Sequence, residues 1–109
     1  MNPYKDDDET ELSKDGELYK KCVDKWGADA QINMVTEELA ELILAIQKWK
    51  RNHSEKTIMD IANEVADVEL MLGQLQYMMD TGIERKYGIH LDYYRAFKRI
   101  RLEERLKTR

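Results

Sequence analysis

Hydrophobic residues recur along most of the chain with the spacing of three and four that is typical of α-helices. Four segments show this pattern, and each is bounded by glycines or by short polar stretches. Leu18, Cys22 and Trp26 are four apart in the first segment, and Gly27 is expected to end it. The predicted helices cover residues 14–26, 29–51, 58–79 and 91–106.

The two central segments carry the longest rows of apolar residues. In the second segment the row comprises Ile32, Val35, Leu39, Leu42, Ile43, Ile46 and Trp49. In the third segment it comprises Ile58, Ile61, Val65, Val68, Leu72, Leu75 and Met79. The third row is the seam of a helix that packs lengthwise on other helices, and the alternation typical of strands is absent. The pattern predicts an all-α fold, a four-helix bundle completed by association between copies.

Two polar stretches are expected to interrupt the helices. In "RNHSEKT", Ser54 or Thr57 can cap the third helix, and Thr57 followed by Asp60 resembles a capping box. In "DTGIERKYGIH", Gly82 and Gly88 are expected to break the chain before the last helix. No linker divides the sequence, so we expect a flexible acidic N-terminus over residues 1–13 and one domain over residues 14–109.

Length and composition favour a small globular protein that associates with itself. The chain has 109 residues, 42% of them hydrophobic and 37% charged. A chain of this length gains little stability from its own core, which favours a homodimer or homotetramer. Cys22 is the only cysteine, which predicts a reducing, cytoplasmic setting, and no apolar run has the length of a membrane span.

The charge is unevenly distributed. The net charge is −4, whereas residues 93–109 carry seven basic residues and two acidic ones. This basic end either binds phosphates or is a solvated helix face. Nucleic acid is disfavoured as a partner by the net charge and by the acidic residues within the last helix.

Five acidic residues lie beside the apolar rows of the two central helices. Glu38 and Glu41 are three apart, Glu37 and Glu41 are four apart, and both pairs therefore share a helix face. Glu64 and Asp67 are three apart on the next helix. Two antiparallel helices packed through their apolar rows would bring these carboxylates into one cleft.

Such a cluster is unfavourable without cations, because adjacent carboxylates raise one another's pKa. Hard divalent cations prefer oxygen ligands, so the pattern favours Mg²⁺, with Mn²⁺ as the alternative. A di-iron bundle would use Glu-x-x-His motifs, and neither His53 nor His90 stands in that relation to these acids. The alternative interpretation is a solvated acidic face with scattered ion pairs.

At these residues the chain resembles the MazG-like all-α nucleoside triphosphate pyrophosphohydrolases. The family signature is EExxE followed by ExxD on the next helix. Here the two motifs are residues 37–41 and 64–67, separated by 22 residues. The likeness extends over about residues 26–75 and is looser in the C-terminal "KRIRLEERL".

The resemblance implies Mg²⁺-dependent hydrolysis of a nucleoside triphosphate to a monophosphate and pyrophosphate. It also implies that Glu38, Glu41, Glu64 and Asp67 hold the metal. Glu37 would hold a second metal or orient the attacking water.

Four further residues are candidates for substrate contacts. Gln31 lies seven residues before Glu38 on the same helix face, where it could meet a base edge. Trp26 either stacks on a base or packs in the core. Lys98 and Arg101 are three apart on the last helix, a geometry suited to phosphate oxygens, and a solvated basic face is the alternative.

Two other functions compete with this interpretation. One is a non-enzymatic helical interaction module whose acidic residues form a docking surface. The other keeps the metal cluster but hydrolyses a different phosphoanhydride, such as phosphoribosyl-ATP.

Overall fold

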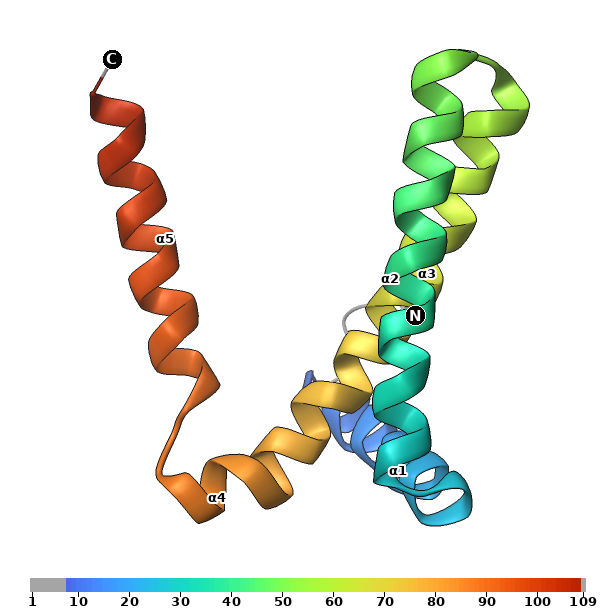
Figure 1. Ribbon diagram of the computed structural model, residues 1–109. Helices are drawn as coiled ribbons and strands as arrows, with labels where there is room; N and C mark the ends of the chain where they lie inside the picture. Colours follow the sequence, from blue (N-terminus) through green and yellow to red (C-terminus); the bar gives the residue numbers. More distant parts are fainter. Residues whose placement is uncertain (1–7, 109) are drawn as a thin grey trace. The chain divides into compact units, whose positions relative to one another are not determined.

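The computed structural model describes residues 8–108, and every regular element in them is a helix (Figure 1). The elements are α1 (Asp8–Trp26), α2 (Ala28–Arg51), α3 (Glu55–Met78), the π-helix η1 (Met79–Ile83), α4 (Glu84–Tyr87) and α5 (Leu91–Lys107). These residues form no β-strand, which confirms the predicted all-α class. The MazG-like bundle and its completion by association stay predictions. No helix among the described residues has the length and apolarity needed to cross a membrane.

The chain divides into two compact units, residues 1–77 and 78–109. The first contains α1, α2 and nearly all of α3, and the second contains η1, α4 and α5. The predicted single domain over residues 14–109 stays a prediction. Helix α1 begins at Asp8, six residues before the expected start. Residues 1–7 of the expected flexible segment lie outside the described residues.

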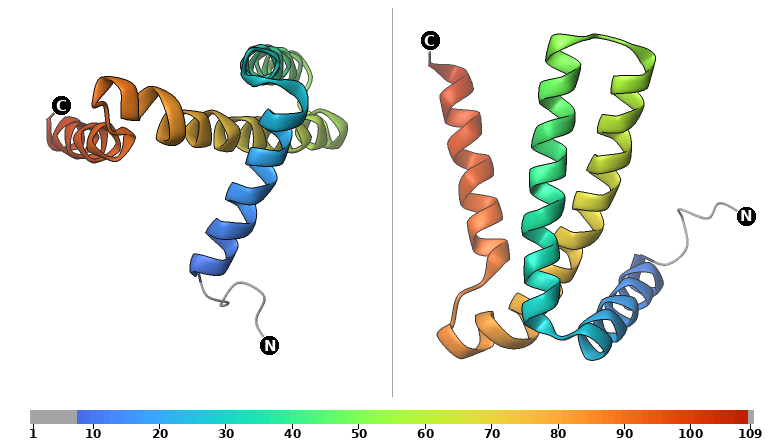
Figure 2. Two further views of the ribbon diagram at one scale, coloured as in Figure 1. Left: turned by 90° about the horizontal axis from the view of Figure 1, so that it is seen from below. Right: turned by 45° about the vertical axis from the view of Figure 1, so that its right-hand side comes forward.

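In the first unit, α2 and α3 lie side by side and antiparallel, joined by a tight connection (Figures 1 and 2). The connection ends in a reciprocal cap. The backbone N–H of Thr57 donates to Oγ of Ser54, and the backbone N–H of Ser54 donates to Oγ1 of Thr57, each at 3.1 Å. Ser54 is thus the capping residue of the two that the sequence allowed. The suggested Thr57–Asp60 box is not the arrangement found, because Asp60 pairs with Lys56 at 2.8 Å.

Helix α1 ends at Trp26, directly before Gly27, as predicted, and the chain turns there into α2 (Figure 2). Gly27 has a φ of 89°, a conformation that costs a side-chain-bearing residue free energy. Farther back, Tyr19 of α1 lies against Gly73 of α3, where a Cβ atom would come 2.6 Å from Cζ of Tyr19. Burial, with nearby Asp15 and Cys22, raises the pKa of the Tyr19 hydroxyl. The missing side chain at residue 73 therefore allows α1 to approach α3.

The inward face of the hairpin differs from the predicted apolar rows. On α2 it comprises Gln31, Val35, Glu38, Leu42, Ala45 and Trp49, which are buried or half-buried. On α3 it comprises Thr57, Ile61, Glu64, Val68, Met71 and Gln74. Seven members of the predicted apolar rows are exposed: Ile32, Leu39, Ile43 and Ile46 on α2, and Ile58, Val65 and Leu72 on α3. The prediction of the inward face was wrong for these residues because an apolar pattern assigns glutamine and glutamate to the outer face.

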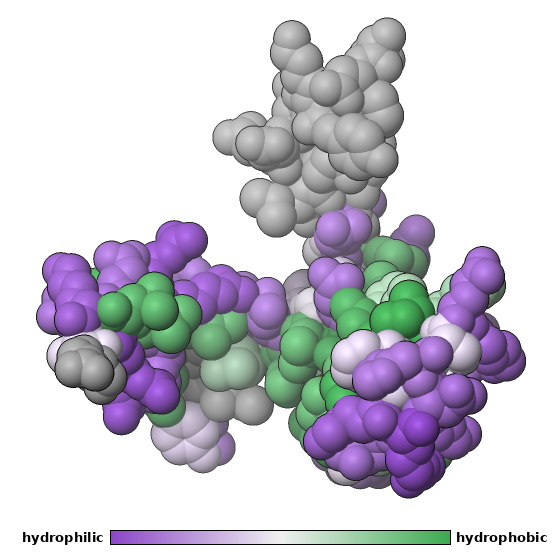
Figure 3. All heavy atoms as spheres, turned by 90° about the horizontal axis from the view of Figure 1, so that it is seen from above, coloured by the Kyte–Doolittle hydropathy of each residue, from purple (hydrophilic) through white to green (hydrophobic). Residues whose placement is uncertain are grey.

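The outward apolar residues leave much hydrophobic surface in the first unit. Ile43 is 62% exposed and Met59 is 61% exposed, and no side chain among the described residues is less than 2% exposed. Figure 3 shows hydrophobic side chains in green among hydrophilic ones in purple at the surface. The hairpin alone therefore buries only part of the apolar surface that its sequence provides.

In the second unit, the helical path continues past Gly82 and ends at Gly88. The expected break at Gly82 was wrong, because the chain accommodates it within the π-helix η1 and continues through α4. Gly88 has a φ of 67°, a left-handed conformation suited to glycine, and α5 follows after His90. Helix α5 has no buried residue, and its aromatic and aliphatic side chains are exposed except for the half-buried Leu91.

Candidate functional site

Three carboxylates from the two antiparallel helices meet in the first unit. Glu38 comes from α2, and Glu64 and Asp67 come from α3, where their spacing of three places them on one face. One oxygen from each side chain lies within 4.8 Å of the others, and all three residues are half-buried. We call these three residues the carboxylate cluster. Its members were all predicted from the sequence to lie together.

One oxygen of the carboxylate cluster is buried without a hydrogen-bond donor. Oε2 of Glu64 has no hydrogen-bond partner among the residues that the structure describes. An unpaired buried carboxylate oxygen is unfavourable unless a donor or a cation satisfies it. Three convergent carboxylates with an unsatisfied oxygen are the donor set that a hard divalent cation prefers. The residues present therefore fit Mg²⁺ or Mn²⁺.

The electrostatics of Glu38 reflect this crowding. Partial burial raises the pKa of its carboxyl group, and the charges of Asp67, Glu64, Glu41 and Glu37 raise it further, in that order. A raised pKa means that the ionised form of Glu38 is disfavoured in the folded protein. A bound cation would reverse this effect, because it attracts the charges that otherwise repel one another.

Glu41 lies beside the cluster but is not one of its three members. It is exposed, and with Glu64 it lines a small cavity of about 100 Å³ between α2 and α3. The cavity is also lined by Leu44, Ala45, Lys48 and Asp60. The assignment of Glu41 as a fourth metal ligand stays a prediction.

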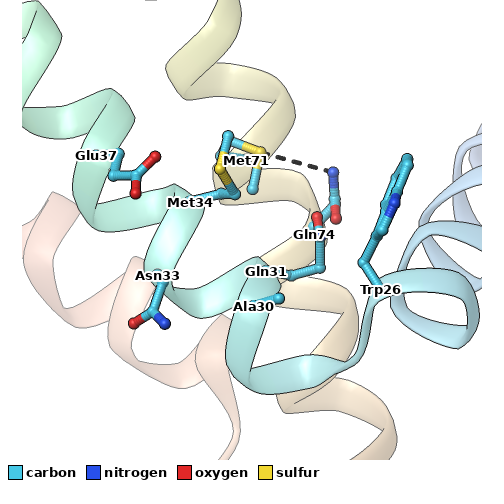
Figure 4. A pocket seen from close by; sticks show the side chains of 8 residues that line it. All are labelled: Trp26, Ala30, Gln31, Asn33, Met34, Glu37, Met71 and Gln74. Atoms are coloured by element: carbon cyan, nitrogen blue, oxygen red, sulfur yellow. Dashed lines mark hydrogen bonds between the residues drawn. The ribbon is translucent and has the colours of Figure 1, made fainter.

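A larger pocket of about 570 Å³ opens in the same unit (Figure 4). It is lined by Trp26, Ala30, Gln31, Asn33, Met34, Glu37, Met71 and Gln74. The pocket lies one helical turn from the carboxylate cluster, because Met34 is four residues before Glu38 on α2 and Met71 is four residues after Asp67 on α3. Three predicted site residues, Trp26, Gln31 and Glu37, therefore lie around one cavity.

The pocket combines an aromatic ring with side-chain amides. Trp26 is 55% exposed, and Nζ of Lys25 lies 5.2 Å from its ring centroid. Gln31 is only 5% exposed. In Figure 4, the indole of Trp26 lies to one side of the Gln31 and Gln74 side chains, and the two methionines lie to the other side. A planar ring with polar edges would find both a stacking surface and hydrogen-bonding groups here.

Gln74 is a buried polar residue of this pocket that was not predicted from the sequence to belong to the site. It is 7% exposed, its Nε2 donates to the thioether of Met71 at 3.7 Å, and its Oε1 has no partner among the described residues. Leaving a buried amide so poorly paired costs about 1–3 kcal/mol. One signal was available in the sequence: Gln74 lies seven residues after Asp67, just as Gln31 lies seven residues before Glu38.

Lys98 and Arg101 lie on α5 in the second unit, and both are exposed. Other cations of this helix pair with its own acids. Nη1 of Arg95 lies 2.8 Å from Oδ1 of Asp92, and Nζ of Lys107 lies 3.5 Å from Oε1 of Glu104. The proposed contacts of Lys98 and Arg101 with phosphate oxygens stay predictions.

The site therefore offers an anionic centre suited to a divalent cation, next to a pocket suited to a planar ring.

Comparison with known proteins finds no match to this chain among family models, curated proteins or solved structures.

Proposed function

We propose that this protein hydrolyses nucleoside triphosphates to nucleoside monophosphates and pyrophosphate, with a divalent cation held by Glu38, Glu64 and Asp67. The observation that carries the proposal is the meeting of these three carboxylates within 4.8 Å beside a pocket of about 570 Å³. A nucleotide fits both parts of this arrangement. Its phosphates are polyanionic and bind divalent cations, and its planar base can stack on an aromatic ring in the pocket.

The cation, the carboxylates that would hold it and Glu37 would each have a separate role in hydrolysis. A bound Mg²⁺ or Mn²⁺ supplies the positive charge that neutralises a triphosphate and favours attack of water on phosphorus. Glu38, Glu64 and Asp67 hold that charge in place, and Glu41 is the proposed fourth ligand. Glu37 lines the pocket next to the cluster, where its carboxylate can orient the attacking water. The oxygen of water bonds to phosphorus as the phosphoanhydride bond breaks, and pyrophosphate leaves.

Within the first unit, binding of the base is assigned to Trp26 and Gln31. Lys98 and Arg101 belong to the second unit, and their predicted role is to hold phosphate oxygens through charge-assisted hydrogen bonds.

A screen for pyrophosphate release tests this function. Ribonucleoside, deoxynucleoside and modified nucleoside triphosphates are incubated with the protein and Mg²⁺ or Mn²⁺. We expect equal amounts of monophosphate and pyrophosphate from at least one class, and no release when EDTA removes the cation. Asp67→Asn should lose most of the turnover, and Glu41→Gln should do so if it is a fourth ligand. Absence of release from every triphosphate would contradict the proposal and would favour a helical interaction module.

A further inference from the structure

The Gln74 amide is the buried polar group that the proposed function leaves unexplained. It is more than nine-tenths buried on the wall of the larger pocket, its amide nitrogen faces a thioether, and its oxygen has no partner among the described residues. A thioether is a weak hydrogen-bond acceptor, so neither end of the amide is well paired. Buried polar groups in folded proteins are usually paired, and an exception at a pocket wall suggests that a ligand supplies the partner.

The position of Gln74 relative to the carboxylate cluster matches that of Gln31. The helices are antiparallel, so seven residues before Glu38 on α2 and seven residues after Asp67 on α3 lead toward the same end of the hairpin. Seven helical residues span about 10 Å along the axis. The two amides therefore lie together, two turns from the cluster, a separation that a sugar and a phosphate can bridge. Figure 4 shows both side chains directed toward the same part of the pocket.

We propose that Gln74, together with Gln31, binds the hydrogen-bonding edge of the nucleobase and determines which bases the site accepts. This inference rests on the proposed function for the identity of the ligand as a nucleotide. Trp26 would stack on the face of the base, and the thioethers of Met34 and Met71 provide polarizable apolar contacts around it.

The chemistry of a carboxamide suits this role. Its N–H donor and its carbonyl acceptor lie side by side, so it can form two parallel hydrogen bonds with a base edge that offers an acceptor next to a donor. In Gln74, Nε2 donates only to a weakly accepting thioether, and Oε1 has no partner among the described residues. Replacement by methionine keeps the length of the side chain but removes both groups, and replacement by glutamate exchanges the donor for an acceptor.

The test is a calorimetric titration of the eight common ribonucleoside and deoxynucleoside monophosphates into the intact protein with Mg²⁺. The parent should prefer some bases over others. Gln74→Met should weaken binding of the preferred nucleotide by about tenfold or more and reduce the differences between bases. Gln74→Glu should shift the preference toward bases that present N–H donors. Gln47→Met, on the exposed face of α2, is the matched control and should behave like the parent.

The outcomes separate this inference from the proposed function. Base-dependent binding that requires Gln74, without hydrolysis of any triphosphate, would support the inference while contradicting the enzymatic proposal. Equal binding of all bases by the parent, no binding at all, or the same small change for Gln74→Met and Gln47→Met would overturn it. Thermal unfolding followed by circular dichroism checks that each variant folds. If Gln74→Met does not fold, an unchanged base preference in Gln74→Glu overturns the proposal that Gln74 determines which bases the site accepts.

Discussion

The carboxyl group of Glu38 has a raised pKa because it is partly buried and lies near Asp67, Glu64, Glu41 and Glu37. In the unfolded chain its pKa returns to the ordinary value for glutamate. The ionised side chain therefore destabilises the metal-free fold above the folded-state pKa, and the penalty disappears once the pH falls below the unfolded-state pKa.

Glu38→Gln should consequently stabilise the metal-free protein at pH 7. We expect a gain below about 1 kcal/mol in the free energy of unfolding, because solvent screens a partly exposed carboxylate. The gain should be clearly smaller at pH 4, because this pH lies just below the ordinary pKa of glutamate, about 4.3, and the side chain is then mostly protonated in both the folded and the unfolded chain. Urea unfolding in EDTA at both pH values measures this difference. Glu69→Gln, an exposed position on α3, is the control, and a gain at pH 4 as large as at pH 7 would contradict the account.

Lys98 and Arg101 provide a second test at the scale of single residues. If they hold triphosphate oxygens, replacement of either by alanine should lower kcat/KM by about ten- to a hundredfold, the effect of a lost charge-assisted contact. Arg99 and Lys107 point away from their shared face by helical spacing, so their alanine variants should resemble the parent. Equal, small losses at all four positions would indicate a diffuse electrostatic field and would remove Lys98 and Arg101 from the site.

At the scale of helices, the approach of α1 to α3 depends on Gly73. A Cβ atom there would come 2.6 Å from Cζ of Tyr19, so Gly73→Ala should destabilise the first unit by about 1–3 kcal/mol despite the higher helix propensity of alanine. Gly16→Ala on α1 is the matched control: a Cβ atom there meets nothing within 4 Å, and we expect a gain of about 0.5–1 kcal/mol. Chemical denaturation of both variants provides the measurement. Stabilisation by both substitutions would show that Tyr19 does not pack on Gly73.

The helices themselves could largely be predicted from the sequence, because their periodicity and capping residues are local features. The end of α1 at Trp26 and the start of α5 at Leu91 agree with the pattern. The π-helix at Gly82 could not be predicted, since glycine usually indicates a break and only the surrounding chain decides whether the helix continues.

The carboxylate cluster could be predicted from spacing because Glu64 and Asp67 share a helix face and Glu38 lies on a facing helix. Gln74 could not be identified in the same way. A single glutamine on a helix has no distinctive pattern, and its significance depends on its burial and on its unpaired oxygen, which only tertiary structure provides.

At the scale of the whole molecule, the outward apolar row of α2 favours association between copies. Ile32, Leu39, Ile43 and Ile46 lie on one side of the helix and are 37–62% exposed. A row of this kind is typical of a surface that a partner covers. A second copy is the simplest partner, because a chain of 109 residues gains limited stability from its own core.

Sedimentation equilibrium at micromolar concentration should therefore show at least a dimer. Ile43→Glu should shift the population toward the monomer, because it places a charge within the covered row. Met59→Glu introduces the same charge at an equally exposed apolar position that lies on α3, outside this row of α2, and should leave the assembly unchanged. A monomeric parent would contradict the prediction.

Glu38, Glu64 and Asp67 are proposed to hold a divalent cation together. Titration of the protein with Mn²⁺, followed by electron paramagnetic resonance of the free ion, measures this binding. We expect saturable binding to the parent, competition by Mg²⁺, and binding weakened by about tenfold or more in Glu64→Gln, since that substitution removes one charged oxygen ligand. Equal binding of Mn²⁺ by the parent and Glu64→Gln, or no saturable binding by the parent, would contradict it.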